Sequence, residues 1–118
     1  MGKLTTHVLD TAHGHPAAKV RVRVYRIGSS DERDLICETV TNADGRCDAP
    51  LLEGSTFEVG VYELVFGAGA YFAGQGEGGP RPPFVGDVVL RFGIADSAQH
   101  YHVPLLVSPW SWSTYRGS

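Results

Sequence analysis

The sequence has few cysteines, no long apolar run and no excess of basic residues. Its 118 residues include only 2 cysteines, Cys37 and Cys47, too few for the disulfide framework of a small secreted domain. We expect both to be free thiols that pack as small hydrophobic side chains, and neither is a candidate nucleophile. No stretch approaches the ~20 apolar residues of a membrane-spanning helix, and the first residues do not resemble a signal peptide. We therefore expect a cytoplasmic protein with no membrane partner.

The net charge argues against a nucleic-acid-binding protein, and the length argues against a second domain. The 10 Lys and Arg residues against 13 Asp and Glu give a net charge of −3 at pH 7. A nucleic-acid-binding protein needs a strong basic excess, so we expect no nucleic-acid partner. A chain of 118 residues is close to the commonest domain size, which predicts a single domain over residues 1–118.

Apolar and polar residues alternate with a period of two in most of the chain, and no window keeps the apolar stripe of an amphipathic helix. The predicted strands with this pattern are residues 4–9, 19–27, 35–41, 88–94 and 101–107. Residues 61–66 are apolar on both parities, which predicts a central strand of the sheet. Turn residues separate them, which is typical of an all-β sandwich or barrel, and we prefer a sandwich of two sheets. The connection over residues 67–83 is rich in glycine and proline and has room for at most a short helix.

Histidines are the first candidates for chemistry. His100 and His102 are two apart on a predicted strand, so both imidazoles project from one face. An ordinary imidazole pKa near ~6.5 suits proton transfer at neutral pH, and the alternative is a pair of solvated surface histidines. His7, in the first predicted strand, is a third candidate, with a structural role as its alternative. His13 and His15 fall in a turn where exposure is expected, and the sequence assigns them no role.

Arg46 follows a tight Asp-Gly turn at residues 44–45, which presents its guanidinium at the end of a loop. Such a planar fork suits a carbonyl, carboxylate or urate-like oxygen and the negative charge that develops on it. An ordinary surface arginine is the alternative. His7 with His100 and His102 also forms a plausible open zinc site, because catalytic zinc takes three protein ligands and one water.

Three motifs, in this order and spacing, resemble those of the transthyretin-like proteins and, within them, the 5-hydroxyisourate hydrolases. They are Leu-Thr-Thr-His-Val-Leu-Asp-Thr at residues 4–11, the segment 41–46 that ends in Asp-Gly-Arg, and His-Tyr-His-Val-Pro-Leu-Leu at residues 100–106, which runs on to Tyr-Arg-Gly-Ser at residues 115–118. The resemblance extends from end to end. It implies a sandwich of two four-stranded sheets with one short helix near residues 70–74. It also implies a homotetramer, a dimer of dimers, with active sites in a central channel.

The resemblance also implies an activity and a site. The activity is hydrolysis of 5-hydroxyisourate to 2-oxo-4-hydroxy-4-carboxy-5-ureidoimidazoline, in the degradation of urate to allantoin, with no metal or other cofactor. The implied catalytic residues are His7, Arg46, His102 and Ser118, and the implied substrate-binding residues are His100, Tyr115, Arg116 and Gly117. Which histidine is the general base is left open.

Two other functions stay open at this stage. One is a non-catalytic transthyretin-type carrier of a small ligand, although the Tyr-Arg-Gly-Ser ending, which that branch of the family alters, favours the enzyme. The other is a zinc-dependent hydrolase that uses the three histidines. Trp110 and Trp112 depart from the family pattern near the expected site.

Overall fold

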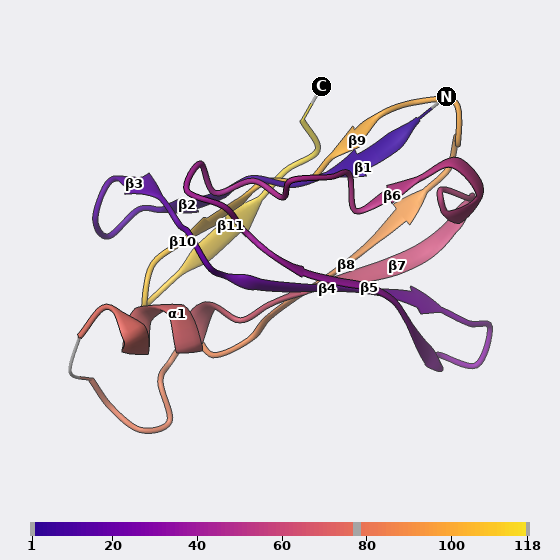
Figure 1. Ribbon diagram of the computed structural model, residues 1–118. Coiled ribbons are helices and arrows are strands. Elements are labelled where there is room, and N and C mark those ends of the chain that lie inside the picture. The colour runs from indigo at the N-terminus through magenta and orange to yellow at the C-terminus, as the bar shows by residue number, and fades with distance from the viewer. Residues whose placement is uncertain (1, 77–78, 118) are drawn as a thin grey trace.

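Two layers of β-sheet pack face to face in the computed structural model, which describes residues 2–76 and 79–117 (Figure 1). One sheet has the strand order β5-β4-β7-β8, and every neighbouring pair is antiparallel. Its strands are β4 (Arg21–Ile27), β5 (Arg33–Val40), β7 (Gly60–Phe66) and β8 (Val88–Ile94). All four lie where the sequence predicts strands, β7 from its apolar character on both faces and the others from alternation.

The second layer consists of two short sheets that continue one another, with the orders β6-β1-β9 and β11-β10-β2-β3. Its strands are β1 (Lys3–Thr5), β2 (Val8–Asp10), β3 (His15–Pro16), β6 (Leu52–Glu53), β9 (Tyr101–His102), β10 (Leu105–Val107) and β11 (Trp112–Thr114). The pairs β1 with β9 and β2 with β10 are both parallel. The amides of Val103 and Leu105 donate to the carbonyls of Thr5 and His7, both over 2.9 Å, and so carry the parallel ladder across the break.

The sandwich predicted from the resemblance is confirmed, with differences in detail. The predicted strands 4–9 and 101–107 are each divided, the first around His7 and the second at residues 103–104. The first break contains His7, and the second directly follows His102. The terminal strand β11 ends at Thr114, before the Tyr-Arg-Gly-Ser tail. The sequence pattern did not predict β3, β6 or the 3₁₀ helix η1 (Gly54–Thr56).

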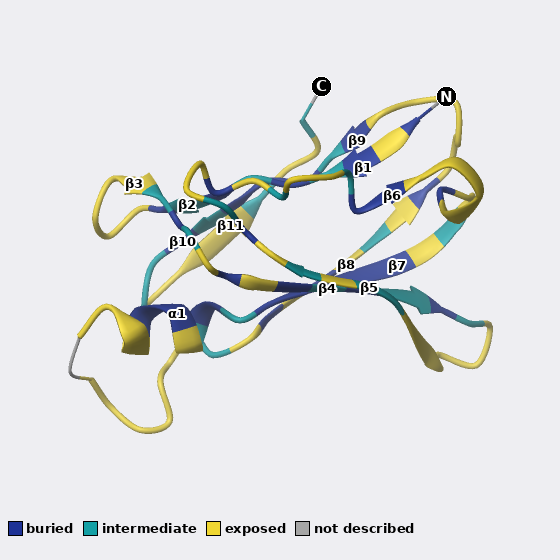
Figure 2. Ribbon diagram, in the orientation of Figure 1, coloured by how far each residue is buried: buried dark blue, intermediate teal, exposed yellow. Residues whose placement is uncertain are grey.

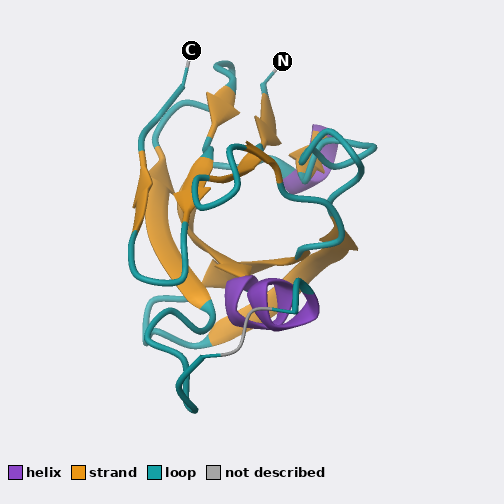
Figure 3. Cartoon of the chain, turned by 90° about the vertical axis from the view of Figure 1, so that its left-hand side faces the viewer, coloured by secondary structure: helices purple, strands orange, loops and turns teal. Residues whose placement is uncertain are grey.

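The short helix α1 (Ala68–Gly74) forms within the glycine-rich connection, where the resemblance places it. It lies across one end of the sandwich, and Figure 3 looks onto that end with α1 in front of the strands. Its buried side chains include Tyr71 and Phe72. Within the described residues, no helix combines the length and apolar character that crossing a membrane requires.

The core lies between the two layers, and Figure 2 marks buried residues on strands of both layers. Alternate residues of β4 point inward, which buries Val22 and Val24 completely, and β7 contributes Tyr62, Leu64 and Phe66. Burying each such side chain contributes about 1.5–3 kcal/mol relative to leaving it exposed. Leu4, Val8 and Leu105 of the second layer belong to the same core, so the strands beside the candidate site pack directly on it.

Candidate active site

His7 lies in the gap between β1 and β2. Its backbone forms an isolated antiparallel bridge with Arg46, and the amide of the next residue, Val8, donates to the Gly45 carbonyl over 2.8 Å. The carbonyl of His7 accepts from the Leu105 amide on the other side over 2.9 Å. Because hydrogen bonds hold the backbone of His7 on both sides, its half-buried side chain projects from a fixed point of the chain.

A tight turn presents Arg46 beside this strand. The side-chain carbonyl of Asn42 accepts hydrogen bonds from the amides of Asp44 (2.9 Å) and Arg46 (3.2 Å), which is how an asparagine stabilises a turn. Gly45 has φ of 74°, and a Cβ there would clash with the Val8 carbonyl oxygen, so the turn requires glycine. The Arg46 side chain is exposed, and no described carboxylate pairs with it. Its charge is available to a ligand.

His102 ends β9, directly beside β1. Thr5 and His102 are register partners in the parallel pair, and Oγ1 of Thr5 lies 2.9 Å from Nδ1 of His102. This contact fixes the plane of the ring and leaves Nε2 as the nitrogen for a substrate or water.

His102 has a lowered pKa. Burial is the largest cause, and the nearby charges of Arg46 and His7 lower the pKa further. The imidazole is therefore neutral at pH 7 and able to accept a proton. Both charges act on His102 through space, so the Arg46 and His7 side chains lie within electrostatic range of its imidazole.

Gly117 lies against the ring of His102. Its amide donates to the His102 carbonyl over 2.7 Å, and the two residues form an isolated bridge. A Cβ on Gly117 would lie 2.8 Å from Cδ2 of His102, closer than real Cβ contacts come. Only glycine lets the tail pass this close without moving the imidazole.

Arg116 fastens the tail to the loop before β9. Its Nη2 donates to the side chain of Gln99 and to the carbonyl of His100, both over 2.9 Å. Its guanidinium carbon lies 4.0 Å from the centre of the Tyr101 ring, within the range of a cation–π contact. These contacts direct the Arg116 guanidinium toward the protein, so the structure shows it supporting the tail beside His102.

A small cleft of about 210 Å³ opens next to this group, lined by Thr5, Thr6 and residues 46–50. Cys47 is part of its wall. Burial, with smaller contributions from Cys37 and Asp48, raises the pKa of Cys47 to about 11. The thiol is therefore protonated at neutral pH, which agrees with its exclusion as a nucleophile.

The remaining residues expected at the site lie around this group. His100 and Tyr115 are exposed, at the loop before β9 and in the tail. Ser118 lies outside the described residues. The roles expected for these three stay predictions, as do the roles of the residues that the structure gathers.

The three-histidine zinc site is not supported by the geometry. Among the described residues, the one group of three or more His, Cys, Asp or Glu side chains close enough to share an ion is Asp10, His13 and His15. His7, His100 and His102 form no such group, because the exposed His100 precedes β9 and is not gathered with the other two.

Two residues with clear structural roles at the site were missed from the sequence. Thr5 contacts His102, and Asn42 holds the turn of Arg46. Thr5 has the same strand parity as His7 in the first motif, which is a signal for a shared face. Asn42 precedes an Asp-Gly turn, a common position for a residue that stabilises such a turn.

Fold and site together define a β-sandwich protein in which two histidines and an arginine lie near one another beside a small cleft. Residues 4–117 match the HIUase/Transthyretin family. The chain belongs to that family.

Similar proteins cover the whole chain. A protein named 5-hydroxyisourate hydrolase from Pseudomonas aeruginosa is 56% identical over 118 residues, which is 100% of this chain and 93% of that protein. The solved structure of Klebsiella pneumoniae 5-hydroxyisourate hydrolase is 36% identical, with a TM-score of 0.82 and full coverage of both chains. The crystal structure of an (S)-allantoin synthase is 51% identical with a TM-score of 0.93. It covers 99% of this chain, but this chain spans only 44% of that one.

The carrier branch is similar in fold and more distant in sequence. Sea bream transthyretin, solved in complex with thyroxine, is 29% identical with a TM-score of 0.87, over 98% of this chain and 94% of that one. The higher identities with hydrolases favour the enzyme over the carrier.

Proposed function

We propose that this protein hydrolyses 5-hydroxyisourate to 2-oxo-4-hydroxy-4-carboxy-5-ureidoimidazoline, in the degradation of urate to allantoin. The observation that carries the proposal is the 56% identity, over the whole chain, with a protein named 5-hydroxyisourate hydrolase. The grouping of His7, Arg46 and His102 supports it, because hydrolysis of a ring amide needs a base for water and a cation for the developing oxyanion.

In the proposed mechanism, His7 and His102 act together on a water molecule. The neutral imidazole of His102 suits the base, and Thr5 holds its ring in place. The water loses one proton to the histidine pair, and its oxygen bonds to the ring carbonyl carbon. The carbon–nitrogen bond then breaks, and the leaving nitrogen takes up the proton.

Arg46 acts on the carbonyl oxygen in this scheme. Its exposed guanidinium, without a carboxylate partner among the described residues, binds the substrate oxygen on which negative charge develops. The tail residues complete the site: Gly117 packs on His102, and Ser118 orients the substrate or a histidine. His100 and Tyr115 are assigned to the rim that binds substrate, and Arg116 holds the tail at that rim through Gln99 and the His100 carbonyl.

Two further parts of the proposal concern assembly and location. The active protein is a homotetramer, a dimer of dimers, in which sites from neighbouring chains line a shared channel. The protein acts in the cytoplasm. Exposed apolar side chains on β11 and in the tail, Trp112 and Tyr115 among them, fit an interface role.

The test is the decay of 5-hydroxyisourate absorbance, with the substrate freshly generated from urate. The protein should accelerate the decay and yield the ureidoimidazoline as the first product, identified by NMR. Tetramer formation is tested separately by sedimentation at the same protein concentration. A decay no faster than that without protein, at full tetramer content, rejects the activity.

A further inference from the structure

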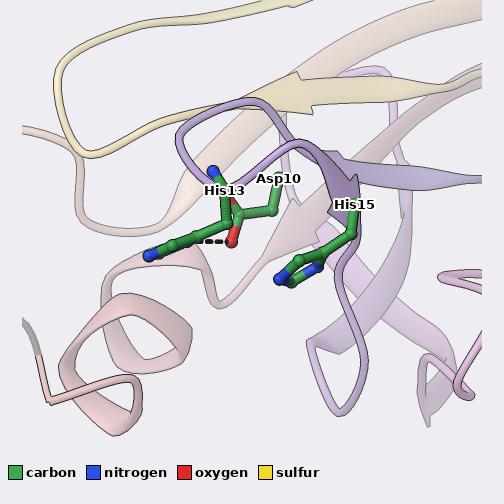
Figure 4. A group of neighbouring side chains, drawn as sticks. All are labelled: Asp10, His13 and His15. Carbon is green, nitrogen blue, oxygen red and sulfur yellow. Dashed lines mark hydrogen bonds and ion pairs between the residues drawn. The ribbon is translucent and has the colours of Figure 1, made fainter.

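A second group of chemically reactive side chains lies at the other end of β2 from His7. It consists of Asp10, His13 and His15, on the hairpin that joins β2 to β3 (Figure 4). One ligand atom from each residue lies within 4.8 Å of the other two. The sequence assigned His13 and His15 no role, because their turn was expected to be exposed and flexible.

The hairpin brings these residues together by its register. Asp10 and His15 are directly opposite partners in the antiparallel pair β2–β3, so their side chains project to the same face. The Gly14 amide donates to the Asp10 carbonyl over 2.8 Å, which closes the turn. The rings of His13 and His15 are stacked, with centroids 5.7 Å apart and planes 18° apart.

The Asp10 carboxylate is anchored from below. Its side chain is fully buried, Oδ1 accepts from the amides of Ala12 and His13, both over 3.0 Å, and Oδ2 accepts from the Tyr71 hydroxyl over 2.8 Å. Burial raises the pKa of Asp10, but the hydrogen bonds from Tyr71 and His13 outweigh it, so the pKa is lowered. The buried Asp10 carboxylate is therefore fixed and ionised, and it lies next to the exposed His13 and His15.

The ring nitrogens are oriented for binding. Nδ1 of His15 contacts the Pro16 carbonyl over 2.8 Å. Since a carbonyl only accepts, Nδ1 carries the proton, and the lone pair of neutral His15 is on Nε2. Nδ1 of His13 lies 2.7 Å from Oδ2 of Asp10.

We propose that Asp10, His13 and His15 bind one divalent cation of the zinc class per chain, through one carboxylate oxygen, two imidazole nitrogens and water. The ion replaces the proton between Nδ1 of His13 and Oδ2 of Asp10, and Nε2 of His15 supplies the third bond. Tetrahedral zinc with bonds of about 2.0–2.2 Å sets neighbouring ligand atoms roughly 3.3 Å apart, so the contact of His13 with Asp10 opens by about half an ångström. The Tyr71 hydroxyl remains on Oδ2 and orients it, as outer-shell partners do in metal sites.

The donor set defines the class of ion. Two imidazoles with one carboxylate suit Zn²⁺, Ni²⁺ or Cu²⁺, whereas Mg²⁺ and Ca²⁺ prefer oxygen ligands. The ion would tie the β2–β3 hairpin together above α1, where His13 also stacks on Phe72 with ring centroids 6.5 Å apart. The inference does not depend on the proposed hydrolysis, since neither His13 nor His15 belongs to that site.

The experiment is equilibrium dialysis of the full chain against ZnCl₂, with ion content measured by mass spectrometry. The wild type should bind one zinc ion at this site, more tightly at about pH 8 than at about pH 6, because histidine binds metal as neutral imidazole. His15→Asn and His13→Asn should each weaken binding at least ~10-fold. Both residues are exposed, so the fold should survive, which circular dichroism checks.

The control is the double variant His7→Asn, His102→Asn, which removes the other histidine group. It should bind zinc at the hairpin with the affinity of the wild type. In imidazole ¹H–¹⁵N spectra, added zinc should shift the resonances of His13 and His15. The proposal is overturned if the wild type binds no zinc at up to ~1 mM, or if His13→Asn and His15→Asn bind as the wild type does. It is equally overturned if only the double variant loses binding. His15→Asn should hydrolyse 5-hydroxyisourate at the wild-type rate. The zinc proposal and the hydrolysis proposal can therefore fail independently of one another.

Discussion

The hydroxyl of Thr5 lies 2.9 Å from Nδ1 of His102, although 97 residues separate the two in the chain. The contact exists because β1 and β9 are parallel neighbours with these two residues in register. Nδ1 of His102 is thereby held by the protein, and Nε2 remains for proton exchange with water or substrate.

Replacing Thr5 with valine removes this hydrogen bond and keeps the shape of the side chain. We expect kcat to fall about 10-fold to 100-fold, because a misplaced catalytic group costs that much. Thr5→Ser should recover most of the loss, and the thermal stability of both variants should stay close to that of the wild type. Thr39→Val, on β5 of the other sheet, is the control and should leave the rate unchanged. Equal rates for Thr5→Val and Thr39→Val would remove Thr5 from the positioning of His102.

The charge of Arg46 is expected to control the protonation of His102. Burial is the largest cause of the lowered pKa of His102, and Arg46 is the next. A lowered pKa keeps the base neutral to lower pH, so activity should be lost only as the pH falls below about 6.5, the ordinary histidine pKa. Arg46→Met should raise the His102 pKa, and the acid limb of the pH–rate profile should move up with it. An NMR titration of the imidazole in both proteins measures this, and an unchanged pKa would contradict the proximity of the two groups.

Arg46 should also matter for the transition state itself. We expect Arg46→Ala to lower kcat/KM at least ~100-fold, the usual cost of removing a well-placed charge stabiliser. The fold should be unaffected, because the side chain is exposed and has no carboxylate partner among residues 2–76 and 79–117. Arg21→Ala, an exposed arginine on β4 that pairs with Glu38, is the matched control. A wild-type rate in Arg46→Ala, with unchanged circular dichroism, would place Arg46 outside the site.

The alternating pattern predicted the strands well where one face of a strand is buried and the other is wet. On β4, Val22 and Val24 are buried. Arg21, which lies between the buried Val20 and Val22 in the sequence, is exposed. The pattern did not predict β3 and β6, which have only two residues each, because so short a strand has no period. The divisions near His7 and at residues 103–104 also escaped the pattern, since they come from pairing between distant segments.

Gly117 should be irreplaceable because of its contact with His102. An added Cβ would lie 2.8 Å from Cδ2 of the imidazole, so Gly117→Ala should displace either the ring or the tail and lower kcat about 10-fold or more. Gly74→Ala is the control, because a Cβ at Gly74 meets no atom within 4 Å. Crystal structures of both variants would show whether the ring moves. Full activity in Gly117→Ala would mean that the tail takes no part in placing His102.

The candidate site was predicted in its residue types but not in its geometry. The resemblance supplied His7, Arg46 and His102, and the structure adds the contacts that relate them. Residue spacing suggested His100 as the partner of His102; in the structure β9 begins at Tyr101, and His100 lies in the loop before it. The sequence did not predict the cluster of Asp10, His13 and His15. The reason is that the cluster depends on the hairpin register, which places Asp10 opposite His15 and is not visible in the sequence.

The most direct test of the central claim is a double-mutant cycle at the histidine pair, measured as 5-hydroxyisourate consumption by tetramers of equal concentration. His7→Asn and His102→Asn should each lower the rate by roughly 100-fold to 10,000-fold, the range for positioned acid–base groups. The double variant should be little slower than the slower single variant, since residues that act as one unit are not additive. Two losses that simply multiply, or a wild-type rate in either single variant, would contradict a shared role of His7 and His102 in activating water.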